Sequence, residues 1–155
     1  MLFRSLRIDG IGMQGHIGME NPSLEDYEKA IVTYTNAGVN VMITEFDISI
    51  LPSPNWNVGA EVSTNFEYQK ELDPYTEGVT EAASTAWNSR MGDFFKLFKK
   101  HSEKISRVTM WGLSDGSSWL NNFPVRRRTD YPLLFDRNYQ PKPVVKEITS
   151  DCSKK

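Results

Sequence analysis

The sequence predicts an α/β fold with parallel strands, because segments with strand character alternate along it with segments of helical periodicity. The predicted order is strand, helix, strand, helix, strand, helix. The 155 residues are enough for one domain with a real core, and an apolar content of 39% is ordinary for a globular protein. We expect residues 1–150 to fold together and residues 151–155, which hold Cys152, to form a solvated tail.

The first strand and the first helix are predicted within residues 7–38. The stretch "RIDGIGMQGHI" (7–17) has strand character and three glycines, which are typical of places where a ligand or another backbone comes close. A helix follows, with Ser23 as its expected N-cap and Gly38 as its stop. Its apolar residues recur every three or four positions: Leu24, Tyr27, Ile31 and Tyr34.

The second strand is predicted within "VNVMITEFDI" (39–48), which is apolar on both faces, as expected for a parallel strand covered on both sides. A long polar segment without clear periodicity follows over residues 49–81. Its aromatic residues either extend a binding cleft or pack inward. They include Trp56, Phe66, Tyr68 and Tyr75.

The second helix, the third strand and a short last helix complete the predicted order. The helix covers "EAASTAWNSRMGDFFKLFKKH" (81–101), the strand runs over about 107–113, and the last helix begins near Gln140. The buried face of the second helix is expected to consist of Trp87, Met91, Phe94, Phe95 and Phe98.

The charge and the hydropathy pattern exclude two classes of partner. A formal net charge of -2 gives no basis for binding a polyanion such as nucleic acid. No stretch approaches the roughly 20 apolar residues that are needed to span a membrane. The apolar run at the N-terminus is also too short for a signal peptide.

Two carboxylates stand at the end of the second strand. Because side chains two residues apart point to the same side of a strand, Glu45 and Asp47 are expected to share a face, with Val41 and Ile43 below them. The carboxyl end of parallel strands is where ligands bind in α/β sheets and barrels. Each acid taken alone is more typical of a salt bridge than of catalysis.

Polar and aromatic residues end the other two strands in the same way. Gln14 and His16 follow the same alternation on the first strand, Trp111 ends the third, and Trp119 follows in its loop. Each has an ordinary structural interpretation when taken alone. Sugar sites need these groups together, because carboxylates supply the chemistry, amide and imidazole groups bind hydroxyls, and indole faces stack on pyranose rings.

The stretches "IDGIGMQGHI", "VMITEFDI" and "WGLSDGSSWL", followed by "FPV" and "YPLLFD", closely resemble the C-terminal part of glycoside hydrolase family 10. The resemblance covers roughly residues 8–148. These enzymes are retaining endo-1,4-β-xylanases built on a (β/α)8 barrel, so it implies that the chain supplies about the last three β/α units. It also implies that the parent enzyme is secreted or periplasmic, needs neither cofactor nor metal, and binds xylan or xylo-oligosaccharide.

The resemblance assigns roles to the strand-end residues. Glu45 matches the catalytic nucleophile, His16 its hydrogen-bond partner, and Asp47 the acid that pairs with this histidine. The substrate-binding residues are then Gln14, Trp111 and Trp119, and Asp115 matches a loop acid that we interpret as structural. The implied mechanism is double displacement through a covalent glycosyl-enzyme.

The acid/base glutamate of the family lies in a strand-four motif that this sequence lacks. A complete barrel needs about 250 residues, and three strands alone would leave Val41, Ile43, Thr109 and Trp111 without their neighbours. We therefore expect that the chain is not a free-standing monomeric enzyme. It completes a barrel with a separate N-terminal segment, pairs with another copy of itself, or is a truncated product of a longer gene. The alternatives are a non-catalytic sugar-binding or structural fragment, or the same fold acting on a β-1,4-glucan.

Overall fold

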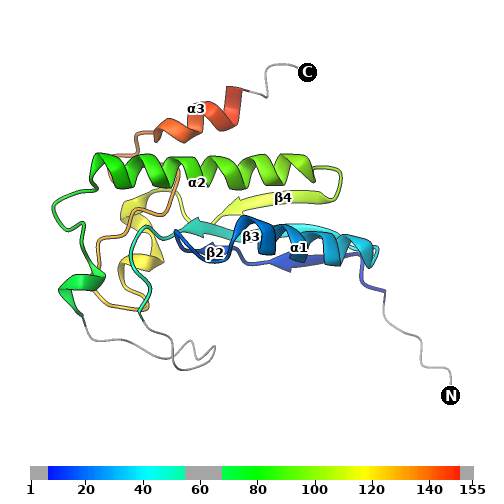
Figure 1. The fold of residues 1–155 in the computed structure, drawn as a ribbon, viewed down its shortest axis with the longest axis horizontal. Helices are drawn as coiled ribbons and strands as arrows, with labels where there is room; N and C mark the ends of the chain where they lie inside the picture. The colour runs from blue at the N-terminus through cyan, green and yellow to red at the C-terminus, as the bar shows by residue number, and fades with distance from the viewer. Residues whose placement is uncertain (1–6, 55–67, 151–155) are drawn as a thin grey trace.

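The computed structural model describes residues 7–54 and 68–150. Its strands and helices follow the predicted alternation (Figure 1). The strands are β1 (Gly10–Met13), β2 (His16–Ile17), β3 (Asn40–Ile48) and β4 (Ile105–Met110). The α-helices are α1 (Leu24–Asn36), α2 (Glu81–Lys100) and α3 (Pro143–Ser150), and three short 3-10 turns are η1 (Lys70–Leu72), η2 (Asp115–Ser117) and η3 (Trp119–Asn121).

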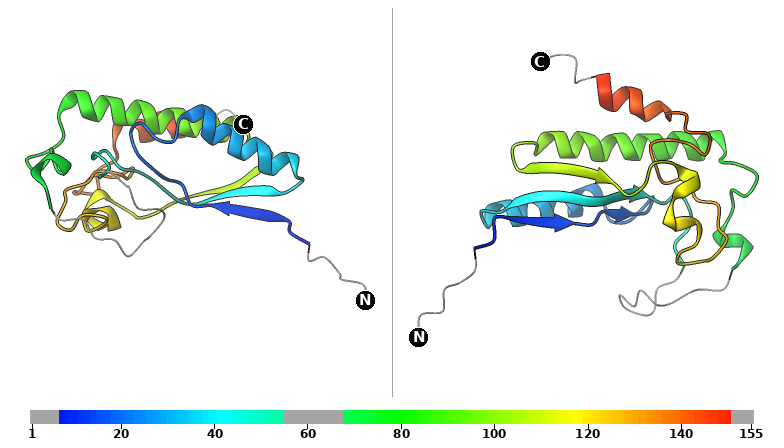
Figure 2. Two further views of the ribbon diagram at one scale, coloured as in Figure 1. Left: turned by 60° about the horizontal axis from the view of Figure 1, so that its bottom comes forward. Right: turned by 180° about the vertical axis from the view of Figure 1, so that it is seen from behind.

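One parallel sheet organises the described part of the chain. β1 and β2 both pair with one edge of β3, so they are two pieces of one interrupted strand, and β4 pairs with the other edge. The helices lie on one side of this sheet, with α3 packed along α2 (Figure 2). The opposite side carries no helix from the described residues. None of the helices in these ranges is long and apolar enough to cross a membrane.

β3 contains a bulge, one extra residue relative to both of its neighbours. Ile43 pairs with Val108 and Phe46 with Met110, so three steps along β3 match two along β4. On the other edge the pairing moves from Met13–Ile43 to His16–Asp47, where four steps on β3 match three. A bulge of this kind shifts the alternation of side chains along the strand.

The bulge corrects the predicted faces of β3. Val41 and Ile43 are fully buried in the core under the helices, together with Phe46 and Ile48, and not below the carboxylates. They therefore keep their neighbours in this structure, contrary to expectation. Without the extra residue, strict alternation would point Glu45 into that apolar core in phase with Ile43. The shift instead places the carboxylates on the face away from the helices.

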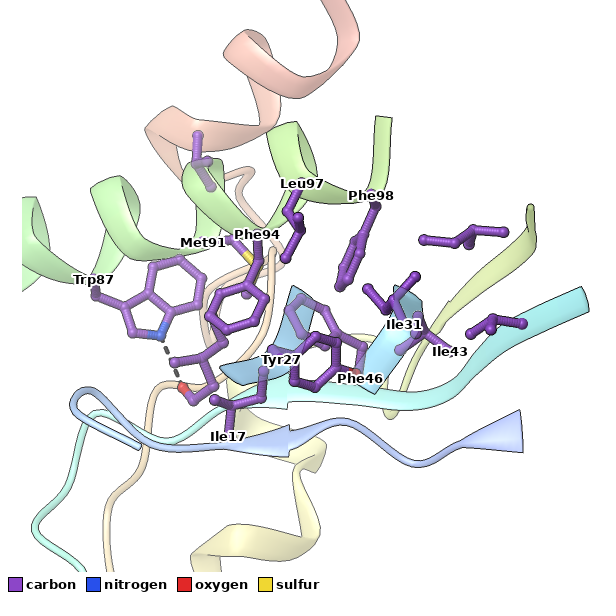
Figure 3. Packing of buried hydrophobic residues seen from close by; sticks show 14 of the residues in the cluster. Ile17, Tyr27, Ile31, Ile43, Phe46, Trp87, Met91, Phe94, Leu97 and Phe98 are labelled. Atoms are coloured by element: carbon purple, nitrogen blue, oxygen red, sulfur yellow. Dashed lines mark hydrogen bonds between the residues drawn. The ribbon is translucent and has the colours of Figure 1, made fainter. Parts of the chain in front are cut away.

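The core lies between the sheet and the helices (Figure 3). Phe46 of β3 packs against Phe98 of α2 at 5.1 Å between ring centroids, and Tyr27 of α1 meets Phe94 at 5.3 Å. The indole of Trp87 donates a 2.8 Å hydrogen bond to the carbonyl of Ile48, which ties α2 to the end of β3. The predicted buried face of α2 is confirmed, with Phe95 only partly buried.

The predicted helix N-terminus at Ser23 is confirmed, because its hydroxyl accepts a 3.0 Å hydrogen bond from the backbone of Asp26.

Two boundaries of the strands and helices differ from prediction. β4 ends at Met110, so Trp111 follows the strand, although its backbone still donates to the carbonyl of Phe46 at 3.0 Å. The last helix begins at Pro143 and not near Gln140.

The segment over residues 49–81 is described only at its two ends. Tyr75 packs against the core, as in the inward alternative, and its carbonyl accepts from the hydroxyl of Tyr131 at 3.1 Å. Tyr68 is 49% exposed. Trp56 and Phe66 lie outside the described residues, as does the predicted tail with Cys152.

Candidate active site

The predicted functional side chains meet where the strands end. His16 belongs to β2, and Glu45 and Asp47 lie among the last residues of β3. Trp111 follows β4 directly, and Trp119 begins η3 in the loop beyond it. Because neighbouring parallel strands end at one edge of the sheet, residues that are about 30 to 100 positions apart in sequence come together there.

A carboxylate–imidazole–carboxylate chain forms the centre of the site. His16 lies between the two acids, with Nδ1 at 3.0 Å from Oδ1 of Asp47 and Nε2 at 3.0 Å from Oε2 of Glu45. Asp47 is fully buried, whereas the side chains of His16 and Glu45 are about a quarter exposed. The expectation that Glu45 and Asp47 share a face is thereby confirmed.

The surroundings of His16 favour its protonated form. Burial acts to lower its pKa, but the hydrogen bonds and negative charges of Asp47 and then Glu45 outweigh this effect, so the pKa of His16 is raised. Both ring nitrogens donate when the ring is protonated, one to each carboxylate. A protonated His16 thus donates to the Glu45 carboxylate and holds it in one orientation.

Indole rings flank this chain. The ring of Trp119 lies 4.8 Å from that of His16, and Trp111 lies 6.4 Å from it, between centroids. The indole of Trp119 donates a 2.9 Å hydrogen bond to Oδ2 of Asp47, so the same buried carboxylate fixes the imidazole and the indole. Trp111 is 45% exposed, which leaves its ring available for stacking.

A buried ion pair supports the loop that carries the two tryptophans. Asp115 is fully buried, accepts from the backbone of Leu133 at 2.9 Å, and pairs with Lys142 at 3.0 Å. The ammonium of Lys142 also donates to the carbonyl of Tyr131 at 2.7 Å and lies 3.9 Å from the ring centre of Trp87. Burial raises the pKa of Asp115 and lowers that of Lys142, while each charge opposes the effect on the other. Asp115 therefore has the structural role that we expected.

Gln14 is the predicted site residue that the side-chain network does not include. β1 ends at Met13, and Gly15 between the two strand pieces has a φ of 91°, so Gln14 and His16 do not alternate along one continuous strand. The side chain of Gln14 is exposed and forms no hydrogen bond with the described residues. Its backbone carbonyl accepts from the amide of Glu45 at 2.7 Å and so helps to place that residue.

Two further residues at the site were missed at the level of sequence. The ring of Phe123 stacks on Trp119 at 4.9 Å and 17°, and Arg128 lines a cavity of about 240 Å³ beside His16, Asp47 and Trp119. The "FPV" motif contains Phe123 and could have indicated it as a site residue. Nothing in the sequence distinguishes Arg128, which is buried, from the two arginines that precede it. No group of three or more metal-ligating side chains is found within residues 7–54 and 68–150.

Comparison with known proteins gives matches over nearly the whole chain. A family model described as "Glycosyl hydrolase family 10" matches residues 1–151. The chain is 53% identical over 142 residues to "Endo-1,4-beta-xylanase A" of Xylanibacter ruminicola, covering 92% of this chain and 38% of that protein. It is 34% identical to "Endo-1,4-beta-xylanase B" of Paenibacillus barcinonensis, with the same coverage.

Solved structures agree with the sequence matches. An endoxylanase retrieved from a sugarcane soil metagenome superimposes with a TM-score of 0.86 at 47% identity, covering 92% of this chain and 41% of that one. A mutant structure in complex with xylotriose superimposes with a TM-score of 0.72 at 32% identity, covering 91% of this chain and 38% of that one. The chain thus spans about two fifths of the length of the relatives it matches.

Proposed function

The chain belongs to glycosyl hydrolase family 10, and on this premise we propose that it is the nucleophile-bearing part of a retaining endo-1,4-β-xylanase. Solved members are (β/α)8 barrels, and the chain matches part of such a barrel with its three β/α units. In the proposed reaction Glu45 attacks the anomeric carbon and forms a covalent glycosyl-enzyme, which water then hydrolyses.

The observation that carries this proposal is the hydrogen bond of Glu45 to His16, which is itself fixed by the buried Asp47 at the carboxyl ends of the strands. The raised pKa of His16 favours its protonated form, and the Nε2–H of that form donates to Glu45 at 3.0 Å and orients the attacking carboxylate. Asp47 supports this arrangement by accepting from the far side of the imidazole. The three residues then act as a unit in which only Glu45 reaches the substrate.

Aromatic and amide groups around Glu45 suit a sugar chain. In the proposal Trp111 and Trp119 stack on pyranose rings, and Gln14, whose side chain is exposed, binds sugar hydroxyls. The substrate is xylan or a xylo-oligosaccharide. Since a polysaccharide of this size does not cross a membrane, we place the parent enzyme outside the cell or in the periplasm.

The proposal includes a partner that completes the barrel. Among the described strands, β1 and β4 pair only with β3, which lies between them. The outer edge of each is therefore free to pair with another parallel strand. Apolar side chains near these edges are exposed: Ile8 by 70% and Leu113 by 66%. An N-terminal barrel segment or another copy of the chain would cover them, and the former would also supply the general acid.

An activated xylobioside with a good leaving group tests the nucleophile directly, because it needs little acid assistance. We expect mass spectrometry to find the sugar on Glu45 of the wild-type chain and no adduct on Glu45→Gln. Native mass measurement and co-expression with an N-terminal barrel segment test the partner. If an assembly cleaves xylan and the Glu45→Gln variant in it keeps full activity, Glu45 is not the nucleophile and the chain has a binding or structural role.

A further inference from the structure

The loop that carries Trp119 has little regular structure of its own. η2 and η3 are 3-10 turns of three residues each, and hydrogen bonds inside such short turns have poor geometry. The ring of Trp119 nevertheless occupies a defined place, because its indole donates to the buried Asp47 and its face stacks on Phe123. Contacts from outside the turn are therefore needed to hold its backbone.

Asn121, the last residue of η3, uses the full hydrogen-bonding capacity of its side chain. Its Nδ2 donates to the carbonyls of Asp115 at 2.8 Å and Ser118 at 3.0 Å. Its Oδ1 accepts from the backbone amide of Asp130 at 3.1 Å and from Nη2 of Arg137 at 2.8 Å. An amide group has two N–H donors and two acceptor lone pairs, so these four bonds satisfy it completely.

These bonds connect the loop of Trp119 with the end of β3. Asp130 is buried, and its carboxylate accepts from the hydroxyl of Ser49, the residue after β3, at 2.6 Å and from the amide of the next residue at 3.1 Å. Trp119 is thus attached to the end of β3 in two ways. Its ring is attached through Asp47, and its backbone through Asn121 and Asp130.

A second asparagine forms a similar bridge far from the strand ends. Nδ2 of Asn88 on α2 donates to the carbonyl of Ser84 at 2.8 Å, and its Oδ1 accepts from the amide of Val144 on α3 at 3.0 Å. Both Asn88 and Asn121 are partly buried. Because Asn88 joins two helices and has no contact with the site, it provides a matched control for the loss of a bridging amide.

We propose that Asn121 is a positioning residue of the sugar site, which holds the backbone of η3 so that the ring of Trp119 stays bonded to Asp47. The inference rests on the proposed xylanase function, in which Trp119 stacks on a pyranose ring, and adds a residue that acts on this stacking without touching the substrate. A ring that is fixed in advance loses less conformational entropy when the sugar binds. Asn121 therefore acts on substrate binding more than on the chemical step.

The indole N–H of Trp119 reports its positioning without any need for enzyme activity. Its exchange with deuterium, followed by NMR, is compared with that of Trp87, whose indole donates to the carbonyl of Ile48 at 2.8 Å in the core. Tryptophan-to-phenylalanine variants assign the two signals. We expect Asn121→Ala to speed the exchange at Trp119 relative to Trp87 about tenfold, the scale of losing two neutral hydrogen bonds.

Two further variants separate positioning from a general loss of stability. Asn121→Asp keeps the acceptor for Asp130 and Arg137, so it should fold, but it lacks the two donors and should also raise the exchange ratio of Trp119. Asn88→Ala should lower the melting temperature without raising this ratio. An unchanged ratio in the folded Asn121 variants, or an equal rise in Asn88→Ala, overturns the inference.

A double-mutant cycle in the assembly that cleaves xylan connects the positioning with function. We expect Asn121→Ala to lower kcat/KM on a xylo-oligosaccharide about three- to tenfold, mainly through KM, which is the scale of one aromatic contact. In a Trp119→Ala background the same change should have almost no further effect. Additive losses would show that Asn121 does not act through Trp119 and would overturn the inference. If Trp119→Ala leaves kcat/KM unchanged while Asn121 still controls indole exchange, the stacking in the proposed function is wrong instead.

Discussion

Replacement of Asp47 by Asn is the perturbation that tests the buried charge chain most directly. The two side chains have the same shape, but the amide carries one acceptor and one donor. Since the indole of Trp119 only donates, the amide oxygen must face it, and the NH2 group must face Nδ1 of His16. The ring then has to accept at Nδ1, which forces it into the neutral form.

The size of the effect follows from burial. Asp47 is fully buried, and its bond to a charged imidazole is of the kind that contributes about 1.5–3 kcal/mol. Glu45 makes the equivalent bond at the same 3.0 Å, but its side chain is 24% exposed, so solvent screens it and the pair contributes about 0–1 kcal/mol. We therefore expect Asp47→Asn to destabilise the protein by about 0.5–3 kcal/mol more than the matched control Glu45→Gln.

Two measurements read out this difference. Urea unfolding at pH 6 gives the loss of stability, and an NMR titration of the imidazole signals gives the direction of the pKa change. The chain has two histidines, His16 and His101, so a His101→Gln variant assigns the signals. We expect Asp47→Asn to lower the pKa of His16 more than Glu45→Gln does, because the charges of Asp47 contribute more to raising it.

The dependence of stability on pH follows from the same raised pKa. A histidine whose pKa is raised by folding contributes its full stability below its unfolded pKa of about 6.5 and loses it as the pH rises through the folded value. The gap between wild type and Asp47→Asn should accordingly be largest at or below pH 6 and shrink above pH 7. Equal losses in the two variants, or a gap that widens with pH, would refute the reasoning.

The remaining predictions concern the loop that carries the tryptophans. Gly112→Ala should cost about 1–3 kcal/mol in urea unfolding, since φ is 143° and a Cβ would lie 2.7 Å from Leu133. Gly38→Ala, with φ 85° and open space around it, should cost only about 1 kcal/mol, so equal losses would argue against the steric contact. Lys142→Met should cost about 3–5 kcal/mol because it leaves the Asp115 carboxylate buried and unpaired, and adding Asp115→Asn should recover part of this. A loss below about 1 kcal/mol, the scale of an exposed ion pair, would show that this pair is not buried as described.

Local signals made the helices predictable. The cap at Ser23 and the apolar stripes of α1 and α2 depend on residues within a few positions of each other, and a sequence displays such spacing directly. The pairing of Glu45 with His16 was also predictable, because strands that end in polar residues at one edge bring these residues together. Arg128 was not predictable, since its burial depends on carbonyls more than 50 residues away.

The sequence by itself determined the α/β order, the helix boundaries near their caps and the chemistry available at the strand ends. The tertiary structure decided which face of β3 each residue takes. Alternation along a strand is a local rule with a period of two, but the extra residue between Ile43 and Phe46 exists only in relation to the neighbouring strands. Pairing across the sheet therefore turned Val41 and Ile43 into the core and placed Glu45 and Asp47 beside His16.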